Sequence, residues 1–227
     1  MPSIVGTPTE DGDKIKLTLD PLNPFLLETL AGDDVVTIYG DGNLSLLTGP
    51  GNDKVQNFAS GDVTLKLAAG DDTFVSSASE TAYSIDTVYA GPGNDTISTG
   101  NGSDWLFGGT GNDTLTGGAG DDTFFYPFII SHEGGTPYGA VIDIKSHCEI
   151  DTITDFKLGS DNLSFGPEQL SLGLFKLWFD LTGYDSDGNG VNDSSSLTLT
   201  SDPTFAINLQ GIQTTEAELY QSITWAI

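Results

Sequence analysis

Large apolar residues recur at a nearly constant spacing along the first half of the chain. From residue 36 to residue 124 they fall about nine residues apart, with small or polar residues between them. Each one stands in a short x-U-x segment, where U is the apolar residue and its two neighbours point outward, as alternate residues do in a strand. The pattern therefore predicts many short strands with one core residue each. The U residues are Val36, Leu46, Val55, Leu65, Phe74, Val88, Ile97, Leu106, Leu115 and Phe124.

The residues between these apolar positions are rich in glycine and aspartate. The clearest copies read TGPGNDKVQ (48–56), AGPGNDTIS (90–98), TGNGSDWLF (99–107), GGTGNDTLT (108–116) and GGAGDDTFF (117–125). They fit G-G-x-G-x-D-x-U-x, and weaker copies begin at Thr29, Tyr39, Phe58, Leu67 and Thr81. The glycine-rich part predicts a tight turn, because glycine tolerates positive φ and close backbone approach. Two repeats then form one coil of about 18 residues, and coils stack at about 4.8 Å.

This repeat resembles the hemolysin-type calcium-binding nonapeptide of the RTX (repeats-in-toxin) family. The resemblance covers residues 29–125, and residues 150–165 resemble the stretch that commonly closes RTX rolls. It implies an all-β fold: a parallel β-roll, completed here by a C-terminal β-rich cap domain. In the family, each Ca²⁺ lies between stacked turns and takes an aspartate from each, plus loop carbonyls. Ca²⁺ needs roughly six to eight oxygen ligands, more than one turn supplies.

Consecutive turns lie on opposite edges of such a roll, so alternate repeats are compared. One set has aspartate at position six in every copy: Asp34, Asp53, Asp72, Asp95 and Asp113. The other set reads Leu44, Val63, Asp86, Asp104 and Asp122. We expect one edge to bind several Ca²⁺ ions along its whole length and the other only toward the C-terminus, with the aspartates outside the core. A turn-forming role is the alternative for any single Gly-Asn-Asp sequence.

Carried over from the family, the ion-binding pairs would be Asp34–Asp53, Asp53–Asp72, Asp72–Asp95, Asp95–Asp113, Asp86–Asp104 and Asp104–Asp122. Two of these sites are irregular in sequence. The Asp72–Asp95 pair spans a five-residue insertion at 76–80, and the repeat that starts at Thr81 has Ser84 where glycine is expected. Facing carboxylates repel one another without metal, so we expect folding to be coupled to calcium binding.

The chain divides into four parts. Residues 1–28 form an N-terminal cap with a strand at Lys14–Leu19, and residues 29–125 form the roll. Residues 126–149 are an inserted loop, and residues 150–227 form the cap domain. In that domain Ile153, Phe156, Leu163 and Phe165 would cover the last coil. Strands are expected at 172–181 and 197–212 and a short helix at 215–222.

The acidic segment DSDGNGVND (185–193) is a second candidate calcium site. Asp185, Asp187, Asn189 and Asp193 occupy positions one, three, five and nine of an EF-hand-like loop. Position twelve is Ser196 instead of glutamate, so the segment is closer to the calcium loops of thrombospondin type-3 or dockerin repeats. The alternative is an acidic hairpin tip.

The composition narrows the list of partners. The formal net charge is −26, with 33 acidic and 7 basic residues and no arginine, so nucleic acid and membrane insertion are unfavourable. Anionic glycans are poor partners unless calcium bridges them. Bound divalent cations would relieve the self-repulsion of the folded chain. There is one cysteine, and the N-terminal residues resemble no signal peptide.

Chemistry other than calcium binding has one candidate region. His132, Glu133, His147, Cys148 and Glu149 fall between the roll and the cap domain. A cysteine near histidine suits covalent catalysis or a transition metal. No CxxC or HExxH spacing is present, and the acidic surroundings raise the pKa of a thiol, so an exposed structural loop is the favoured interpretation.

The sequence favours a secreted, calcium-folded module with a structural or binding role. RTX proteins are typically exported by type I secretion without a cleaved N-terminal signal, and extracellular calcium would fold the chain after export. Contact with a glycan, a cell surface or a partner domain is expected. The alternative is the calcium-binding part of a secreted or multi-domain enzyme, with an active site at 126–150 or on a partner domain.

Overall fold

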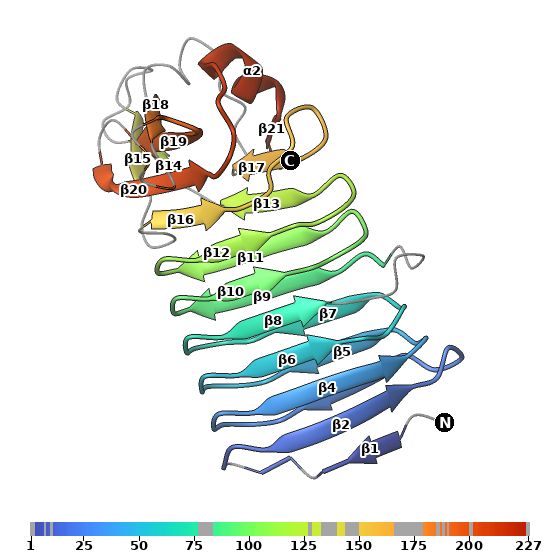
Figure 1. Cartoon of the computed structure of the whole chain (residues 1–227). Coiled ribbons are helices and arrows are strands. Elements are labelled where there is room, and N and C mark those ends of the chain that lie inside the picture. The colour runs from blue at the N-terminus through green and yellow to red at the C-terminus, as the bar shows by residue number, and fades with distance from the viewer. Residues whose placement is uncertain are drawn as a thin grey trace.

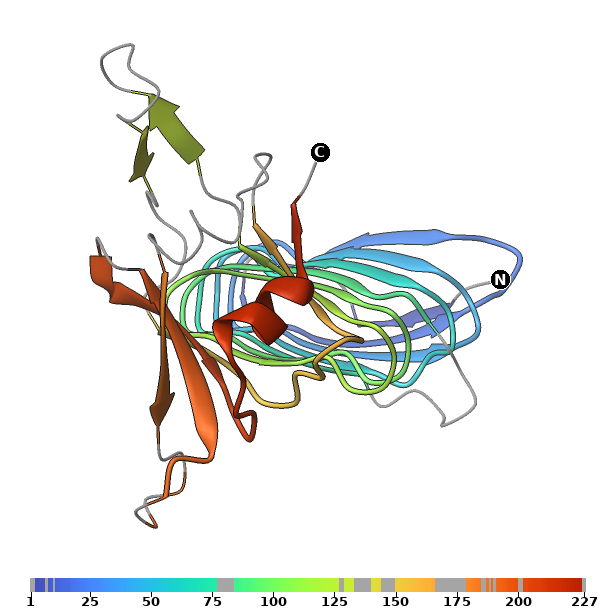
Figure 2. The ribbon, with the colours of Figure 1, turned by 90° about the horizontal axis from the view of Figure 1, so that it is seen from above.

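The computed structural model describes most of the chain. The described residues are 3–6, 8–9, 11–76, 84–126, 129–132, 140–143, 150–165, 179–184, 187, 189, 191–199 and 202–225. Within them the chain winds as a stack of flat coils that form two facing sheets, with the N-terminus at the lower end of the stack in Figure 1. Seen along the stack, the coils superpose as flattened loops, and β18 to β20 lie to one side of them (Figure 2).

The first sheet contains eleven of the described strands. In spatial order these are β1 (Ser3–Val5), β2 (Lys14–Leu19), β4 (Val35–Gly40), β6 (Lys54–Asn57), β8 (Thr73–Ser76), β10 (Thr96–Ser98), β12 (Thr114–Thr116), β16 (Ile150–Ile153), β20 (Asp202–Leu209), β19 (Ser194–Leu199) and β18 (Phe179–Tyr184). From β2 to β20 all neighbours run parallel, whereas β1, β19 and β18 are antiparallel to their neighbours.

The second sheet contains eight of the described strands and runs alongside the first. In order these are β21 (Ile223–Trp225), β17 (Asn162–Phe165), β13 (Thr123–Tyr126), β11 (Trp105–Thr110), β9 (Thr87–Pro92), β7 (Val63–Lys66), β5 (Leu44–Leu47) and β3 (Phe25–Glu28). A separate hairpin pairs β14 (Ile129–His132) with β15 (Ala140–Asp143), and the helix α2 spans Glu216–Gln221.

The apolar residue of each repeat fills the space between the sheets, as predicted. All ten U residues are at most 1% exposed, and they stack in register: Val36 pairs with Val55, Val55 with Phe74, and Phe74 with Ile97. Deep burial of one apolar side chain per repeat provides most of the driving force for stacking. The predicted parallel β-roll with a β-rich C-terminal region is confirmed.

The turns depend on glycine where successive coils approach each other. Gly51 has φ of 150°, and a Cβ placed on it would lie 2.1 Å from the carbonyl oxygen of Gly32 in the coil below. Position two of the turn also has positive φ, and two repeats place another residue there: Leu30 (φ 82°) and Ala68 (φ 79°). Both residues therefore adopt a backbone conformation that residues other than glycine rarely adopt.

Both ends of the stack are closed by chain segments. The predicted strand Lys14–Leu19 is β2, and β1 covers its outer edge. At the other end β16 and β17 pair in parallel with β12 and β13 and so add one more coil. Ile153, Phe156, Leu163 and Phe165 are all buried there.

The region after this coil agrees with the predictions in part. The helix at 215–222 is confirmed as α2, with Thr215 as its N-cap in a capping box with Glu218. The strand structure expected at 197–212 is present as two antiparallel strands, β19 and β20. Of the strand predicted at 172–181, only residues from 179 onward are described, and they belong to β18. No helix of the described residues is long and apolar enough to cross a bilayer.

Candidate calcium-binding turns

The position-six aspartates of the first edge form a continuous hydrogen-bonded ladder. The backbone N–H of Asp34 donates to Oδ1 of Asp53 at 2.8 Å, and Asp53 donates in the same way to Asp72 at 2.7 Å. The pattern continues from Asp72 to Asp95 and from Asp95 to Asp113, each at 2.8 Å. One oxygen of each carboxylate is therefore used to join its coil to the preceding one.

The opposite edge carries a shorter ladder of the same kind. Asp86 donates to Asp104 at 2.8 Å, and Asp104 donates to Asp122 at 3.0 Å. In the preceding turns Leu44 and Val63 occupy position six, and both are buried. Apolar side chains thus fill the place that a carboxylate occupies further along this edge.

The second oxygen of these carboxylates is buried without a hydrogen-bond partner. This holds for Oδ2 of Asp34, Asp53, Asp72, Asp95, Asp113 and Asp151 on the first edge and of Asp86, Asp104 and Asp122 on the second. All nine residues are at most 2% exposed. The aspartates thus lie in the turns, outside the hydrophobic core as expected, and they are buried there. Burial of an unpaired charged oxygen is costly unless a cation or a proton compensates it.

The electrostatic consequence is a raised pKa for the aspartates from Asp53 to Asp151 on the first edge and from Asp86 to Asp161 on the second. Burial, which disfavours the charged form, raises the pKa of Asp86, Asp95 and Asp122 to about 7 and that of Asp151 to about 8. Neighbouring carboxylates add to the shift, as Asp104 does for Asp86. These side chains hold their protons up to near-neutral pH unless a cation replaces them.

The donor set fits a hard divalent cation. Each space between two coils is bordered by carboxylate oxygens from both, at a turn that also carries backbone carbonyls, and Ca²⁺ prefers oxygen ligands of these types. In the described part of the chain, no three His, Cys, Asp or Glu side chains converge on one point. The aspartates thus form a ladder of pairs, and an ion held by a pair would need carbonyl oxygens of the turns to complete its shell.

One end of each ladder has a carboxylate whose second oxygen accepts a hydrogen bond. At the N-terminal end, Oδ2 of Asp13 accepts the N–H of Thr9 at 2.6 Å. At the C-terminal end of the second edge, Asp161 accepts the N–H of Asp122 at 3.1 Å through Oδ1 and that of Lys157 at 2.8 Å through Oδ2. At these two ends the protein itself supplies the partner, whereas Oδ2 of Asp151 and of Asp86, at the other end of each ladder, has none.

Asp151 and Asp161 were missed as candidate residues. Asp151 accepts the N–H of Asp113 at 2.9 Å, and Asp161 continues the other edge. Both lie in the segment 150–165 that the sequence assigned to the cap domain. The sequence contains a signal for them, since each stands two residues before a large apolar residue, Ile153 and Leu163, as in D-x-U.

The two irregular sites keep the ladder geometry. Residues 77–83 lie outside the described residues, yet β8 and β10 pair in register across them, from Thr73 with Thr96 to Val75 with Ser98. Ser84, in place of glycine, is buried, and Asp86 still accepts the N–H of Val63 at 3.0 Å. Neither the insertion nor the missing glycine displaces the aspartates.

The second candidate calcium site is only partly described. Asp187 accepts the backbone N–H of Asn189 at 3.1 Å and its side-chain amide at 2.8 Å, and Ser194 donates to Asp193 at 2.9 Å. Asp185 lies outside the described residues. A calcium site at this loop stays a prediction.

The structure describes almost nothing of the residues that were considered for catalysis or for a transition metal. His132 is the last residue of β14, and nothing is described of its side chain. Glu133, His147, Cys148 and Glu149 lie outside the described residues. Their roles stay predictions.

Comparisons with known proteins agree with the repeat. The family model of the RTX calcium-binding nonapeptide repeat, which spans four copies, matches residues 83–113 and 98–126. Among solved structures, the extracellular lipase LipA from Serratia marcescens is similar at 16% sequence identity with a TM-score of 0.42, over 96% of this chain and 39% of the lipase chain. The chain thus spans less than half the length of that lipase. No curated protein sequence matched it.

Proposed function

Because residues 83–126 carry RTX calcium-binding nonapeptide repeats, we propose that the chain is a secreted β-roll module whose folding is coupled to Ca²⁺. The module serves a structural or binding role outside the cell. Its ions lie between successive turns, held by the position-six aspartates of both edges.

One observation carries this proposal: the nine buried Oδ2 atoms that lack a hydrogen-bond partner. Neighbouring residues of this set form five pairs on the first edge, from Asp34–Asp53 to Asp113–Asp151. They form two pairs on the second edge, Asp86–Asp104 and Asp104–Asp122. A divalent ion at each pair would give the buried Oδ2 atoms the cationic partner that they lack. The pair Asp113–Asp151 extends the set that the sequence indicated.

Extracellular function follows from the chemistry of the sites. Loops that repel one another without metal need a compartment rich in calcium, and cytosolic calcium is too scarce to fill them. The single cysteine also means that no intramolecular disulfide can replace the ions as a crosslink. Type I secretion, as is typical of the RTX family, fits a chain that stays unfolded until it meets calcium.

The proposal is tested by calcium titration of the purified chain. We expect isothermal titration calorimetry to report several ions that bind cooperatively. At pH 8, excess EDTA should abolish most of the β-sheet signal in far-UV circular dichroism, and added calcium should restore it. Magnesium at the same concentration is the control, because its small octahedral shell fits this ladder poorly. An unchanged far-UV spectrum in EDTA, or no heat on calcium addition, would refute calcium-coupled folding.

A further inference from the structure

The outer face of the first sheet has an unusual composition at its N-terminal end. β2 and β4 are six residues long, and together with the start of the third coil they present nine outward residues in three columns. We call this the cationic face; its residues are Lys14, Val35 and Lys54, then Lys16, Thr37 and Gln56, then Thr18, Tyr39 and Phe58. Neighbouring strands are about 4.8 Å apart and alternate residues about 6.6 Å apart, so the face is a small, regular grid.

The charges of the molecule are separated between its edges and this face. The acidic side chains of the repeats lie in the turns, whereas the cationic face contains three lysines and no carboxylate. Lys14, Lys16 and Lys54 are exposed, and none of the described carboxylates forms an ion pair with them. Of only 7 basic residues in the chain, three lie together on this grid and form no ion pair with a described carboxylate.

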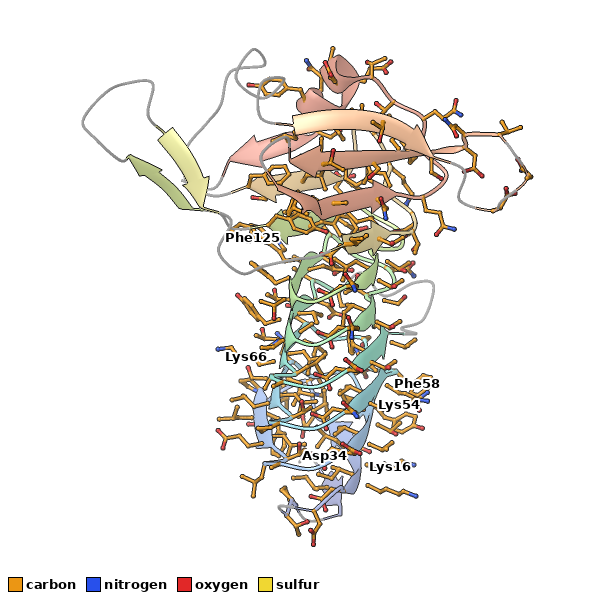
Figure 3. The ribbon with its side chains drawn as sticks, turned by 90° about the vertical axis from the view of Figure 1, so that its left-hand side faces the viewer. Lys16, Asp34, Lys54, Phe58, Lys66 and Phe125 are labelled. Atoms are coloured by element: carbon orange, nitrogen blue, oxygen red, sulfur yellow. The ribbon has the colours of Figure 1, made fainter. Side chains whose placement is uncertain are left out.

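Aromatic rings lie beside these lysines. The rings of Tyr39 and Phe58 stack with centroids 5.3 Å apart, and Lys16 Nζ lies 4.7 Å from the centroid of the Tyr39 ring. Tyr39 is 37% and Phe58 43% exposed, so apolar surface next to cations remains open to solvent. Figure 3 shows Lys16, Lys54 and Phe58 on one side of the roll and Lys66 and Phe125 on the opposite side.

Protection of a sheet edge does not account for the lysines. Lysine is common on edge strands, where it prevents association with another sheet. Here β1 pairs with the outer edge of β2, and Lys54 lies in β6, between β4 and β8. All three lysines therefore project from internal strands of the described sheet, where solubility alone does not require them.

We propose that the cationic face binds an anionic polysaccharide. Ammonium groups on a rigid grid can pair with the carboxylate or sulfate groups of successive sugars, and the C–H faces of the sugar rings can pack on Tyr39 and Phe58. Interactions with charges farther than about 8 Å from the face are largely screened at physiological salt. The inference reverses the expectation, drawn from the missing arginines, that such glycans bind only through bridging calcium.

The test uses the calcium-loaded chain and a sulfated oligosaccharide prepared from heparin, because sulfate esters do not gel with calcium. We expect binding in isothermal titration calorimetry, and none to an uncharged dextran oligosaccharide of equal length. The triple variant K14E/K16E/K54E should lose affinity by about tenfold or more and show a weaker dependence on salt, since fewer counterions are released. Lys66→Glu, which reverses a single lysine charge on the opposite sheet, should bind as the wild type does.

A second variant separates packing from charge. Phe58→Thr should weaken binding several-fold while leaving the salt dependence unchanged. Calcium-induced circular dichroism is recorded first for every variant, so a failure of calcium-coupled folding is distinguished from a failure of glycan binding. If the glutamate variant does not fold, K14Q/K16Q/K54Q replaces it with the same expected direction. Equal affinity of the triple variant and Lys66→Glu, or binding to anionic phospholipid vesicles but not to the oligosaccharide, would overturn the proposal.

Discussion

At the scale of single residues, each position-six aspartate has two separate tasks. Oδ1 accepts a backbone N–H from the neighbouring coil, which a neutral side chain could also do. Oδ2 is buried and has no protein partner, so it is the oxygen that requires a cation or a proton. The two tasks can be separated by a substitution that keeps an acceptor but removes the charge.

Asp53→Asn is that substitution. Asp53 belongs to two of the aspartate pairs that are proposed to bind calcium. We therefore expect the variant to bind fewer calcium ions and to need several-fold more calcium for half-maximal folding. The matched control is Asp33→Asn, which removes the same charge at an exposed position of the same edge, where Asp33 accepts the N–H of Asn52 at 2.8 Å. Calorimetry measures the number of bound calcium ions, and circular dichroism measures the calcium concentration at which half of the chain is folded. Equal ion numbers in both variants would remove Asp53 from the ligand set.

Backbone conformation gives a second prediction at this scale. Ala68 has φ of 79°, where its homologue one coil earlier is Gly49 with φ of 87°. Ala68→Gly should therefore stabilise the calcium-loaded roll by up to about 1 kcal/mol, because the strain removed exceeds the backbone entropy lost. Ala69→Gly, one residue away and without positive φ, should destabilise it. Thermal unfolding in saturating calcium measures both, and a lower melting temperature for Ala68→Gly would contradict the assignment of strain.

At the scale of the strand, a three-residue strand such as β12 contributes to folding stability mainly through its single inward residue, which lies between two outward ones. In β12, Leu115 is 1% exposed and stacks between Ile97 and Ile153, whereas Thr114 faces solvent. β12 has no other core residue to compensate for a loss at Leu115. A cavity there affects the two neighbouring coils as well.

We therefore expect Leu115→Ala to cost about 2–5 kcal/mol of unfolding free energy in saturating calcium. Thr114→Ala in the same strand should cost less than about 1 kcal/mol, since it changes only exposed surface. Denaturant titration at fixed calcium measures both values. Similar losses for the two variants would mean that the core does not depend on the U residues.

The strands were largely predictable from the sequence, and the site was predictable in part. The nine-residue period placed all ten U residues correctly because the repeat is local and each copy supports the others. The burial of Asp34 and its neighbours was not predictable, since it depends on how a turn folds over the coil below it. Asp151 was missed because 38 residues separate it from Asp113, and only the stacked structure shows that they are adjacent.

At the scale of the whole molecule, the buried carboxylates act together and link stability to pH. Without calcium, burial raises the pKa of Asp72 and Asp113 to about 6 and that of Asp151 to about 8, from an ordinary value of 3.8. A carboxyl group whose pKa is higher in the folded state favours folding when protonated. Its contribution is complete below its unfolded pKa and is lost as the pH rises through the folded pKa.

In EDTA we therefore expect more β-sheet circular dichroism at pH 5 than at pH 8, with the loss between about pH 6 and pH 8. In calcium the dependence should reverse, since the ions bind deprotonated carboxylates and affinity rises with pH over the same range. Sedimentation at each pH controls for association near the isoelectric point of about 4.1. A calcium-free chain equally unfolded at both pH values would show that protons cannot replace the ions.

The spacing between stacked aspartates varies widely along the chain while their contact does not. It is 19 residues from Asp34 to Asp53, 23 from Asp72 to Asp95 and 38 from Asp113 to Asp151, with nearly the same N–H to Oδ1 distance each time. Extra residues can therefore be inserted between two stacked strands at a free-energy cost close to that of closing a longer loop. This entropic cost grows only slowly with loop length. Such a scaffold can acquire new appendages by insertion without rebuilding its interior, and the positions after Ser76 and Tyr126 are natural places to graft a foreign peptide.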